Sequence, residues 1–227
     1  MRNSRWRKLR LCAGLLAVLA VQALASEAQV GRLLPVDEAS RDPDLFLFRA
    51  RLQEAVARHD LAAVLEAIDP EIRNSFGGGG GIDEFREQWD LPSDQSDFWH
   101  QMGLALSLGG TFYDENTFAA PYLIKNFPED LDAFEHLVLI GSDVRVRAEP
   151  RLGSEVLAVL SFDILPFARE ANERLSEKQS EEWTAVLLRD GGIGYVASRY
   201  LRSAIDYRAI FNRKNGRWWL TAFIGGD

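Results

Sequence analysis

The spacing of hydrophobic residues predicts two helices near the start of the chain. Apolar side chains recur at helical intervals between Leu45 and Val56, directly after the cap and first-turn pair Asp42-Pro43. A second such stretch, Leu61 to Ile68, follows Asp60 and ends ahead of Pro70, because proline disfavours a helical residue before it. The two stretches predict a helical hairpin with one apolar stripe on each helix.

The pattern then mixes strands and helices up to residue 140. Residues 72–76 alternate between apolar and polar side chains and predict a strand, which a run of five glycines follows. A helix is expected from Ile82, and Ser96 or Asp97 can cap another. Residues 118–128 favour a strand broken by proline, and an acidic turn or helix leads into a strand that ends near residue 140. Residues 42–140 therefore predict an α+β domain.

Short alternating strands with turn residues between them fill residues 141–203 and predict a small β-barrel. The block also carries a series of motifs in a fixed order: "VRVR" at 144–147, Pro150 to Ser154, Val156 to Leu160, Trp183 to Val186, Gly191 to Val196, and Tyr200-Leu201. With these motifs, residues 142–202 resemble a bacterial SH3-like domain. The resemblance implies a small barrel that binds peptide, often the stem or cross-bridge peptide of peptidoglycan, and implies no catalysis.

Two features depart from that family's pattern. Asp163 stands where the family usually has glycine, and residues 170–182 form an insertion that contains five glutamates. We expect the insertion to be a solvated loop, with an acidic docking surface as the alternative. Both departures lie beside the usual groove of the family, so the ligand does not follow from the resemblance.

Five aromatic residues of this block are candidates for a ligand-binding groove, since flat side chains suit peptide recognition. They are Phe162, Phe167, Trp183, Tyr195 and Tyr200. Trp183 and Tyr195 fit a core position equally well, so Phe162 and Tyr200, which lie near loops, are the first choices.

The C-terminal segment 204–227 predicts a β-hairpin that turns at Asn215-Gly216 and has apolar residues on both faces. An isolated hairpin is barely stable in water, so we expect this one to pack on the 42–140 domain. The predicted fold is therefore α+β, with the SH3-like barrel inserted between the helical part and the hairpin. This wider layout resembles a family of exported bacterial proteins, a resemblance that implies no activity.

The first 25 residues have the composition of a secretory signal peptide. Five basic residues and no acid precede an apolar run from Leu11 to Ala25, which is shorter than the roughly 20 residues that span a bilayer. An uncleaved anchor is the less favoured alternative. We expect a periplasmic or secreted protein, with an extended leader at residues 26–41.

Cleavage after Ala25 removes five positive charges, so the net charge falls from -8 to -13. Such a charge opposes nucleic acid and anionic membrane surfaces and favours basic or amine-bearing partners. The chain's one cysteine, Cys12, lies inside the signal segment, so the mature chain has no disulfide and no thiol nucleophile.

Catalytic motifs are absent from the sequence. His59, His100 and His136 are far apart and in no ligand pattern, and no Gly-x-Ser-x-Gly motif occurs. Glu87 could share one helix face with Asp83 or Glu84, as in a glycosidase, although a charged solvent face is the commoner arrangement. We expect no metal and no cofactor.

The glycine run at 77–81 does not predict a phosphate loop, because Ile82, Asp83 and Glu84 follow it in place of Lys and Ser/Thr. It predicts a flexible bend or a close approach of another segment, for which residues 225–227 are the candidate.

The favoured function is non-enzymatic binding of peptide or cell-wall material by an exported protein. The partner would be a peptide, a peptidoglycan stem peptide or an envelope protein. The alternatives are a cell-envelope hydrolase that uses helix carboxylates, and an adaptor or inhibitor of another envelope protein.

Overall fold

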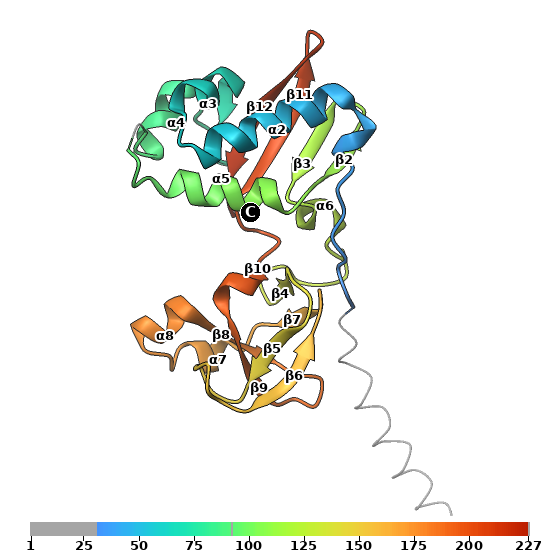
Figure 1. Cartoon of the computed structure of the whole chain (residues 1–227), viewed down its shortest axis with the longest axis vertical. Coiled ribbons are helices and arrows are strands. Elements are labelled where there is room, and N and C mark those ends of the chain that lie inside the picture. Colours follow the sequence, from blue (N-terminus) through green and yellow to red (C-terminus); the bar gives the residue numbers. More distant parts are fainter. Residues whose placement is uncertain (1–30, 92, 227) are drawn as a thin grey trace, which may run out of the picture.

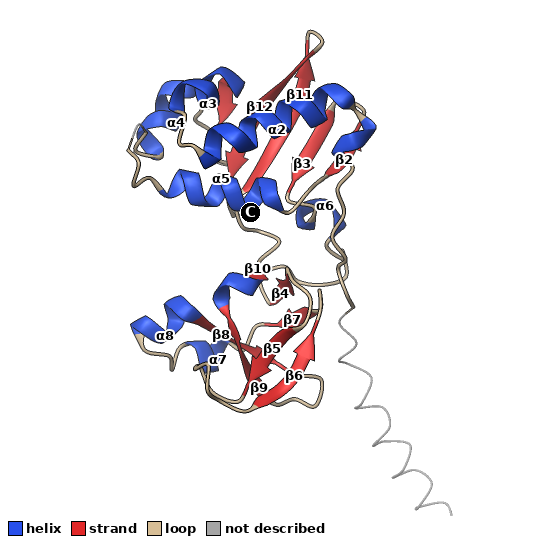
Figure 2. Ribbon diagram, viewed as in Figure 1, coloured by secondary structure: helices blue, strands red, loops and turns tan. Residues whose placement is uncertain are grey.

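The computed structural model describes residues 31–91 and 93–226, and its two lobes contain helices and strands in an α+β arrangement (Figures 1 and 2). The α+β class predicted from the sequence is therefore confirmed. The predicted signal peptide at residues 1–25, Cys12 within it, and the first part of the predicted leader lie outside the described residues.

Helices cover one face of the first lobe. They are η1 (Ala39–Arg41), α2 (Pro43–Ala57), α3 (Leu61–Ala67), α4 (Ile82–Gln88) and α5 (Asp97–Ser107). The short α6 (Leu123–Asn126) packs elsewhere, through Leu123 with Val138 and Ile164. The predicted caps are present: the Asp42 carboxylate accepts a bond from the Leu45 N–H at 3.0 Å, and the Asp60 carboxylate accepts one from the Ala63 N–H at 3.1 Å. Side chains that bond these free N–H groups define where α2 and α3 begin.

The sheet of the first lobe has five strands in the order β1-β12-β11-β3-β2. They are β1 (Ile68–Arg73), β2 (Thr111–Asp114), β3 (Thr117–Ala120), β11 (Arg208–Lys214) and β12 (Arg217–Ile224). The hairpin turns at Asn215 and Gly216, whose φ angles of 53° and 77° suit the predicted turn. The hairpin lies inside the sheet, with β11 paired to β3 and β12 paired to β1.

Two boundaries differ from the sequence prediction. Ile68 and the Asp69-Pro70 pair belong to β1, not to a helix end, so the strand begins earlier than the predicted 72–76. Proline is tolerated because β1 is an edge strand, and Asp69 is held by an ion pair with Lys214 at 2.6 Å. In the predicted strand 118–128, only the first residues are strand, and α6 follows Pro121.

An aromatic core joins the helices to the hairpin. Trp89 contacts Phe223 of β12 with ring centroids 5.2 Å apart, and Phe98 of α5 lies 5.8 Å from the same Phe223 ring. Trp218 of β12 is buried, and its ring lies 6.2 Å from that of Phe112. The last strand of the chain therefore supplies the surface on which the early helices pack.

The second lobe consists of a three-stranded sheet, β10-β4-β7, and a four-stranded sheet, β6-β5-β9-β8. The strands are β4 (His136–Leu139), β5 (Val144–Arg147), β6 (Val156–Leu160), β7 (Ile164–Pro166), β8 (Trp183–Leu187), β9 (Ile193–Ala197) and β10 (Leu201–Arg202), with η2 (Ser198–Tyr200) before β10. Val146, Val186, Val196 and Leu139 form its buried centre. Within the described residues the two sheets do not close into one barrel.

The acidic insertion is helical, so the predicted loop at residues 170–182 is wrong in its backbone. It contains the end of α7 (Arg169–Asn172) and all of α8 (Glu177–Glu182), and Ser176 with Gln179 forms a capping box on α8. Asn172 fixes it by accepting a bond from the Ala185 N–H at 2.8 Å. All five glutamates are exposed, as expected of a solvated segment.

The leader is bonded to the second lobe, a contact that its sequence does not predict. The Leu33 N–H donates to the Phe162 carbonyl at 2.8 Å, and Arg32 forms an antiparallel bridge with Asp163. Leu33 is buried with Tyr122, Leu123, Val138 and Ile164, a cluster drawn from both lobes. A single buried side chain such as Leu33 produces no periodic pattern, so the sequence of residues 26–41 predicts only an extended segment.

The glycine run folds back on its own strand. The Gly81 N–H donates to the Ile72 carbonyl at 2.8 Å, and the Gly80 N–H donates to the Glu84 carboxylate at 3.0 Å. A Cβ at Gly80 would lie 2.7 Å from the Ile72 oxygen, so a larger residue does not fit. The close neighbour is Ile72, not the expected Gly225 or Gly226, and the Gly226 N–H instead bonds to the Ile205 carbonyl. Asp227 lies outside the described residues.

Neighbouring tryptophans on opposite faces of β12 test the role of the hairpin. Trp218→Ala should lower the free energy of unfolding by about 3–5 kcal/mol, because it empties a site in the core. Trp219 is only half-buried, and the Arg217 guanidinium lies 4.0 Å from the centroid of its ring. Trp219→Ala should therefore lower the free energy of unfolding by only roughly 1 kcal/mol. Urea unfolding of both variants measures the difference. Equal losses would contradict a core that depends on β12.

Acid should weaken the attachment of the leader. Burial raises the pKa of Asp37, but paired bonds from Arg49 and a bond from the Ala39 N–H outweigh it and hold that pKa below its ordinary value. A lowered carboxyl pKa gives stability that is present above about pH 4 and is lost as the pH falls through the folded-state value. Asp37→Asn should therefore be less stable near neutral pH and lose less stability on acidification.

Urea unfolding at a series of pH values measures this effect, and Glu181→Gln on the exposed α8 is the control. The wild type and Glu181→Gln should show the same decline with acid. An Asp37→Asn curve parallel to theirs would show that this carboxylate does not contribute.

Candidate functional site

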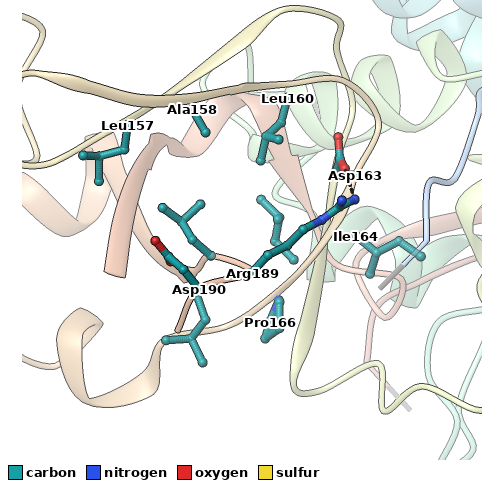
Figure 3. Close-up of a pocket in the computed structure, with 11 residues that line it drawn as sticks. Leu157, Ala158, Leu160, Asp163, Ile164, Pro166, Arg189 and Asp190 are labelled. Carbon is teal, nitrogen blue, oxygen red and sulfur yellow. Dashed lines mark ion pairs between the residues drawn. The ribbon is translucent and has the colours of Figure 1, made fainter. Parts of the chain in front are cut away.

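A cavity of about 270 Å³ lies in the second lobe, at the seam between its two sheets. One wall comes from β6, another from β7 and the residue before it, and the third from the segment that follows β8 (Figure 3). The lining residues are Leu157, Ala158, Leu160, Asp163, Ile164, Leu165, Pro166, Leu187, Leu188, Arg189 and Asp190. The cavity is thus where the lobe fails to close.

Most of this lining is aliphatic. Ala158 and Leu160 alternate along β6 and pack against the centre of the lobe, as do Leu165 of β7 and Leu188. Ala158 is the smallest of the lining residues. The cavity can therefore take an apolar group without exposing buried polar atoms.

Asp163 and Arg189 provide the polar part of the lining. The Arg189 side chain extends towards Asp163 (Figure 3), and its guanidinium lies 3.7 Å from that carboxylate. Arg32 of the leader approaches the other carboxylate oxygen at 3.6 Å. Only 4% of the Asp163 side chain is exposed, against 68% for Arg189, so a buried carboxylate pairs with an exposed guanidinium.

The loop before β7 explains the position of Asp163. Its carboxylate accepts a bond from the Ser161 N–H at 2.9 Å, and the hydroxyl of Ser161 accepts one from the Asp143 N–H at 2.8 Å. Phe162 between them has a φ of 59°, a conformation that favours glycine. The Asp163 side chain thus stabilises a tight loop.

The five predicted aromatic residues do not line this cavity. Trp183 is buried, Tyr195 packs against Ala168, Ala171 and Ala185, and Phe162 and Phe167 are half-buried. Tyr200 is 39% exposed, with the guanidinium of Arg199 5.0 Å from its ring centroid. No ring contact in the described part of the chain joins two of the five.

The sequence analysis does not predict the cavity, although the strands that line it have an unusual pattern. Leu157, Ala158 and Leu160 belong to a strand that is apolar on both faces, whereas a strand with one solvated face should alternate. Leu187 and Leu188 repeat this feature at the end of β8. Apolar residues on both faces indicate a second contact, but they do not identify its location.

The other candidate residues do not gather into a catalytic group. Glu84 caps the glycine run, and Asp83 and Glu87 are exposed on α4. His59 stacks on Trp99 with ring centroids 4.6 Å apart, and His136 bonds to the Asp132 carbonyl. Among residues 31–91 and 93–226, no three His, Cys, Asp or Glu side chains are placed to hold a metal ion.

Larger hollows occur on the first lobe, but their linings are mixed. One of about 630 Å³ lies beside His59, Trp99 and His100, and another of about 460 Å³ lies on the uncovered face of the five-stranded sheet, beside Phe76 and Arg208. Arg208 already bonds to the Gly226 carbonyl at 2.6 Å and lies over the Phe76 ring. The smaller cavity at the seam has a mostly aliphatic lining, apart from Asp163, Arg189 and Asp190.

Comparison with known proteins assigns no family. The chain matches no protein-family model, and no curated protein matches it. In the part of the chain that the structure describes, no helix has the length and apolar character needed to cross a bilayer.

Removing the Asp163 carboxylate should destabilise the lobe. Asp163→Ala leaves the Ser161 N–H without its acceptor in a partly buried loop, so it should lower the free energy of unfolding by about 1–3 kcal/mol. Arg189→Gln removes only an exposed ion-pair partner and should cost about 1 kcal/mol or less. Thermal unfolding of the two variants compares them, and a larger loss for Arg189→Gln would contradict the role given to Asp163.

Proposed function

We propose that this chain is an exported, non-enzymatic binding protein whose second lobe is an open SH3-like barrel. In this proposal the protein acts in the periplasm or outside the cell, and the ligand is a peptide or the peptide part of peptidoglycan. The apolar cavity at the barrel seam is the observation that carries the proposal. The mostly aliphatic lining suits binding of an apolar group, and its residues form no recognised catalytic arrangement.

The size of the cavity supports a peptide side chain as the bound group. Pockets for drug-sized ligands and cofactors usually measure roughly 300–1,000 Å³, and this one measures about 270 Å³. Its aliphatic lining suits a methyl-bearing side chain such as alanine, valine or leucine. Arg189 at the mouth could bond a carboxylate or a main-chain carbonyl of the same ligand.

The alternative functions receive less support. A hydrolase that uses the α4 carboxylates would need them free for substrate, and Glu84 is bonded to the Gly80 N–H. An adaptor for an envelope protein would use the same cavity for a peptide segment of that protein. The two proposals therefore predict the same contacts in the cavity. They differ in whether the bound peptide belongs to peptidoglycan or to an envelope protein.

Sedimentation with purified peptidoglycan sacculi, alongside capture from an envelope extract, tests the proposal. The mature protein should appear in the pellet with sacculi and release no soluble fragments from them. Protein that remains in the supernatant but captures one stoichiometric envelope protein would favour the adaptor. Release of fragments that Glu84→Gln abolishes would favour the hydrolase.

Two variants locate the binding surface. Ala158→Trp fills the cavity and should weaken binding to sacculi, whereas Tyr200→Ala removes the most exposed of the predicted aromatic residues. Loss of binding in Tyr200→Ala alone would move the site from the cavity to the aromatic surface. Circular dichroism and thermal unfolding must show that both variants fold.

A further inference from the structure

Strand β6 is an edge that the rest of the chain leaves unpaired. It occupies one end of the four-stranded sheet and pairs only with β5 among the described strands (Figure 2). An edge strand presents a row of free N–H and C=O groups, which natural proteins usually protect with charges, proline or a covering segment. The sequence of β6, Val156 to Leu160, contains none of these.

The exposed side chains of β6 are also apolar. Val156, Leu157 and Val159 are 41%, 44% and 55% exposed. Their neighbours Ala158 and Leu160 point into the lobe and line the cavity. An apolar edge with a cavity along it combines main-chain bonding groups with a side-chain pocket, the two requirements of peptide binding by strand addition.

The same lobe already binds an extended segment in this way. The leader lies antiparallel to residues 162–164, with the Leu33 N–H bonded to Phe162 and the Ile164 N–H bonded to Gly31. Leu33 is buried in an apolar cluster, while Arg32 on the other face pairs with Asp163. Asp163 also lines the cavity, so this intramolecular strand addition and the cavity share a residue.

We propose that an extended peptide adds to β6 as a further strand of the four-stranded sheet and places one aliphatic side chain in the cavity. This inference rests on the proposed binding function and gives the bound peptide its conformation. Alternate residues of the peptide face the lobe, so the recognised pattern is an aliphatic residue followed two positions later by another. The volume of about 270 Å³ limits the inserted group to one or two small side chains.

A matched set of short synthetic peptides tests this binding mode. The probe is the acetylated and amidated pentapeptide Thr-Leu-Thr-Leu-Thr with a fluorescent label, together with versions that carry valine, isoleucine or phenylalanine in place of leucine. Fluorescence anisotropy with the mature chain measures binding. Absence of binding by all four peptides up to about 1 mM would overturn the proposal.

Methylation of the peptide backbone separates strand addition from simple burial of a side chain. Alternate residues of a strand direct their N–H groups to opposite sides. One analogue is methylated on both leucine amides and the other on the amides of the threonines at positions 3 and 5. Only one of the two should lose binding, by about tenfold or more. Equal affinities for the two analogues would overturn strand addition.

Variants of β6 test the location. Ala158→Trp should weaken binding of the unmethylated probe by about tenfold to a hundredfold, the effect of leaving one aliphatic side chain unburied. Val159→Lys places a charge on the edge and should also weaken binding, whereas Val159→Thr keeps the β-branched shape and should bind like the wild type. Normal probe binding by both Ala158→Trp and Val159→Lys would overturn the assignment to this edge.

The edge could instead be covered by a second copy of the chain. Sedimentation equilibrium would then show a dimer that Val159→Lys converts to a monomer, and that result would overturn the peptide assignment. A separate result would overturn the proposed function. If the chain binds the probe with the expected methylation pattern but does not sediment with sacculi, strand addition stands and peptidoglycan is not the ligand.

Discussion

The hydrogen-bonding requirement of the C-terminal hairpin determines how the chain is organised. β11 bonds to β3 on one side and β12 bonds to β1 on the other, so the last two described strands are inner strands of the sheet. Without them, β1 would be separated from β2 and β3, and the helices would have no continuous surface to cover. The first lobe therefore depends on a segment that lies about 90 residues after β3 in the sequence.

The same requirement makes the second lobe an insertion. The chain must leave the first lobe after α6 and return to it at β11, so the two ends of the inserted lobe have to lie close together. They do so by pairing: Leu139 and Val138 of β4 lie opposite Leu201 and Arg202 of β10. The leader adds a further connection through Leu33, whose cluster contains residues of both lobes. Burial of this cluster stabilises the pairing of the lobes as well as each lobe itself.

Local signals in the sequence predicted the parts of the fold that depend on neighbouring residues. Asp42 and Asp60 are caps because their carboxylates reach N–H groups three residues away, and Asn215-Gly216 turns the hairpin because both residues adopt positive φ. The hairpin's need for a covering surface followed from the apolar residues on both of its faces. These properties require no knowledge of distant residues.

The other features of the fold and of the site depend mainly on contacts between residues that are far apart in the sequence. Pro70 lies within a strand because β1 is at the edge of the sheet, a fact determined by the whole topology. The insertion is helical because Asn172 bonds to Ala185 and because Ser176 caps α8, neither of which hydrophobic spacing reveals. Aromatic residues are a common sign of a binding surface, yet this cavity is lined mainly by aliphatic residues from β6, β7 and the end of β8.

The incomplete closure of the second lobe connects its stability to its function. Closing the seam between β6 and β7 would pair the free edge and bury Leu157 and Leu160, which would favour stability alone. The buried Asp163 carboxylate lies at this seam, where it accepts a bond from the Ser161 N–H and pairs with Arg32 and Arg189. An apolar edge beside an open cavity is stable only if the lobe tolerates its cost or a ligand offsets it.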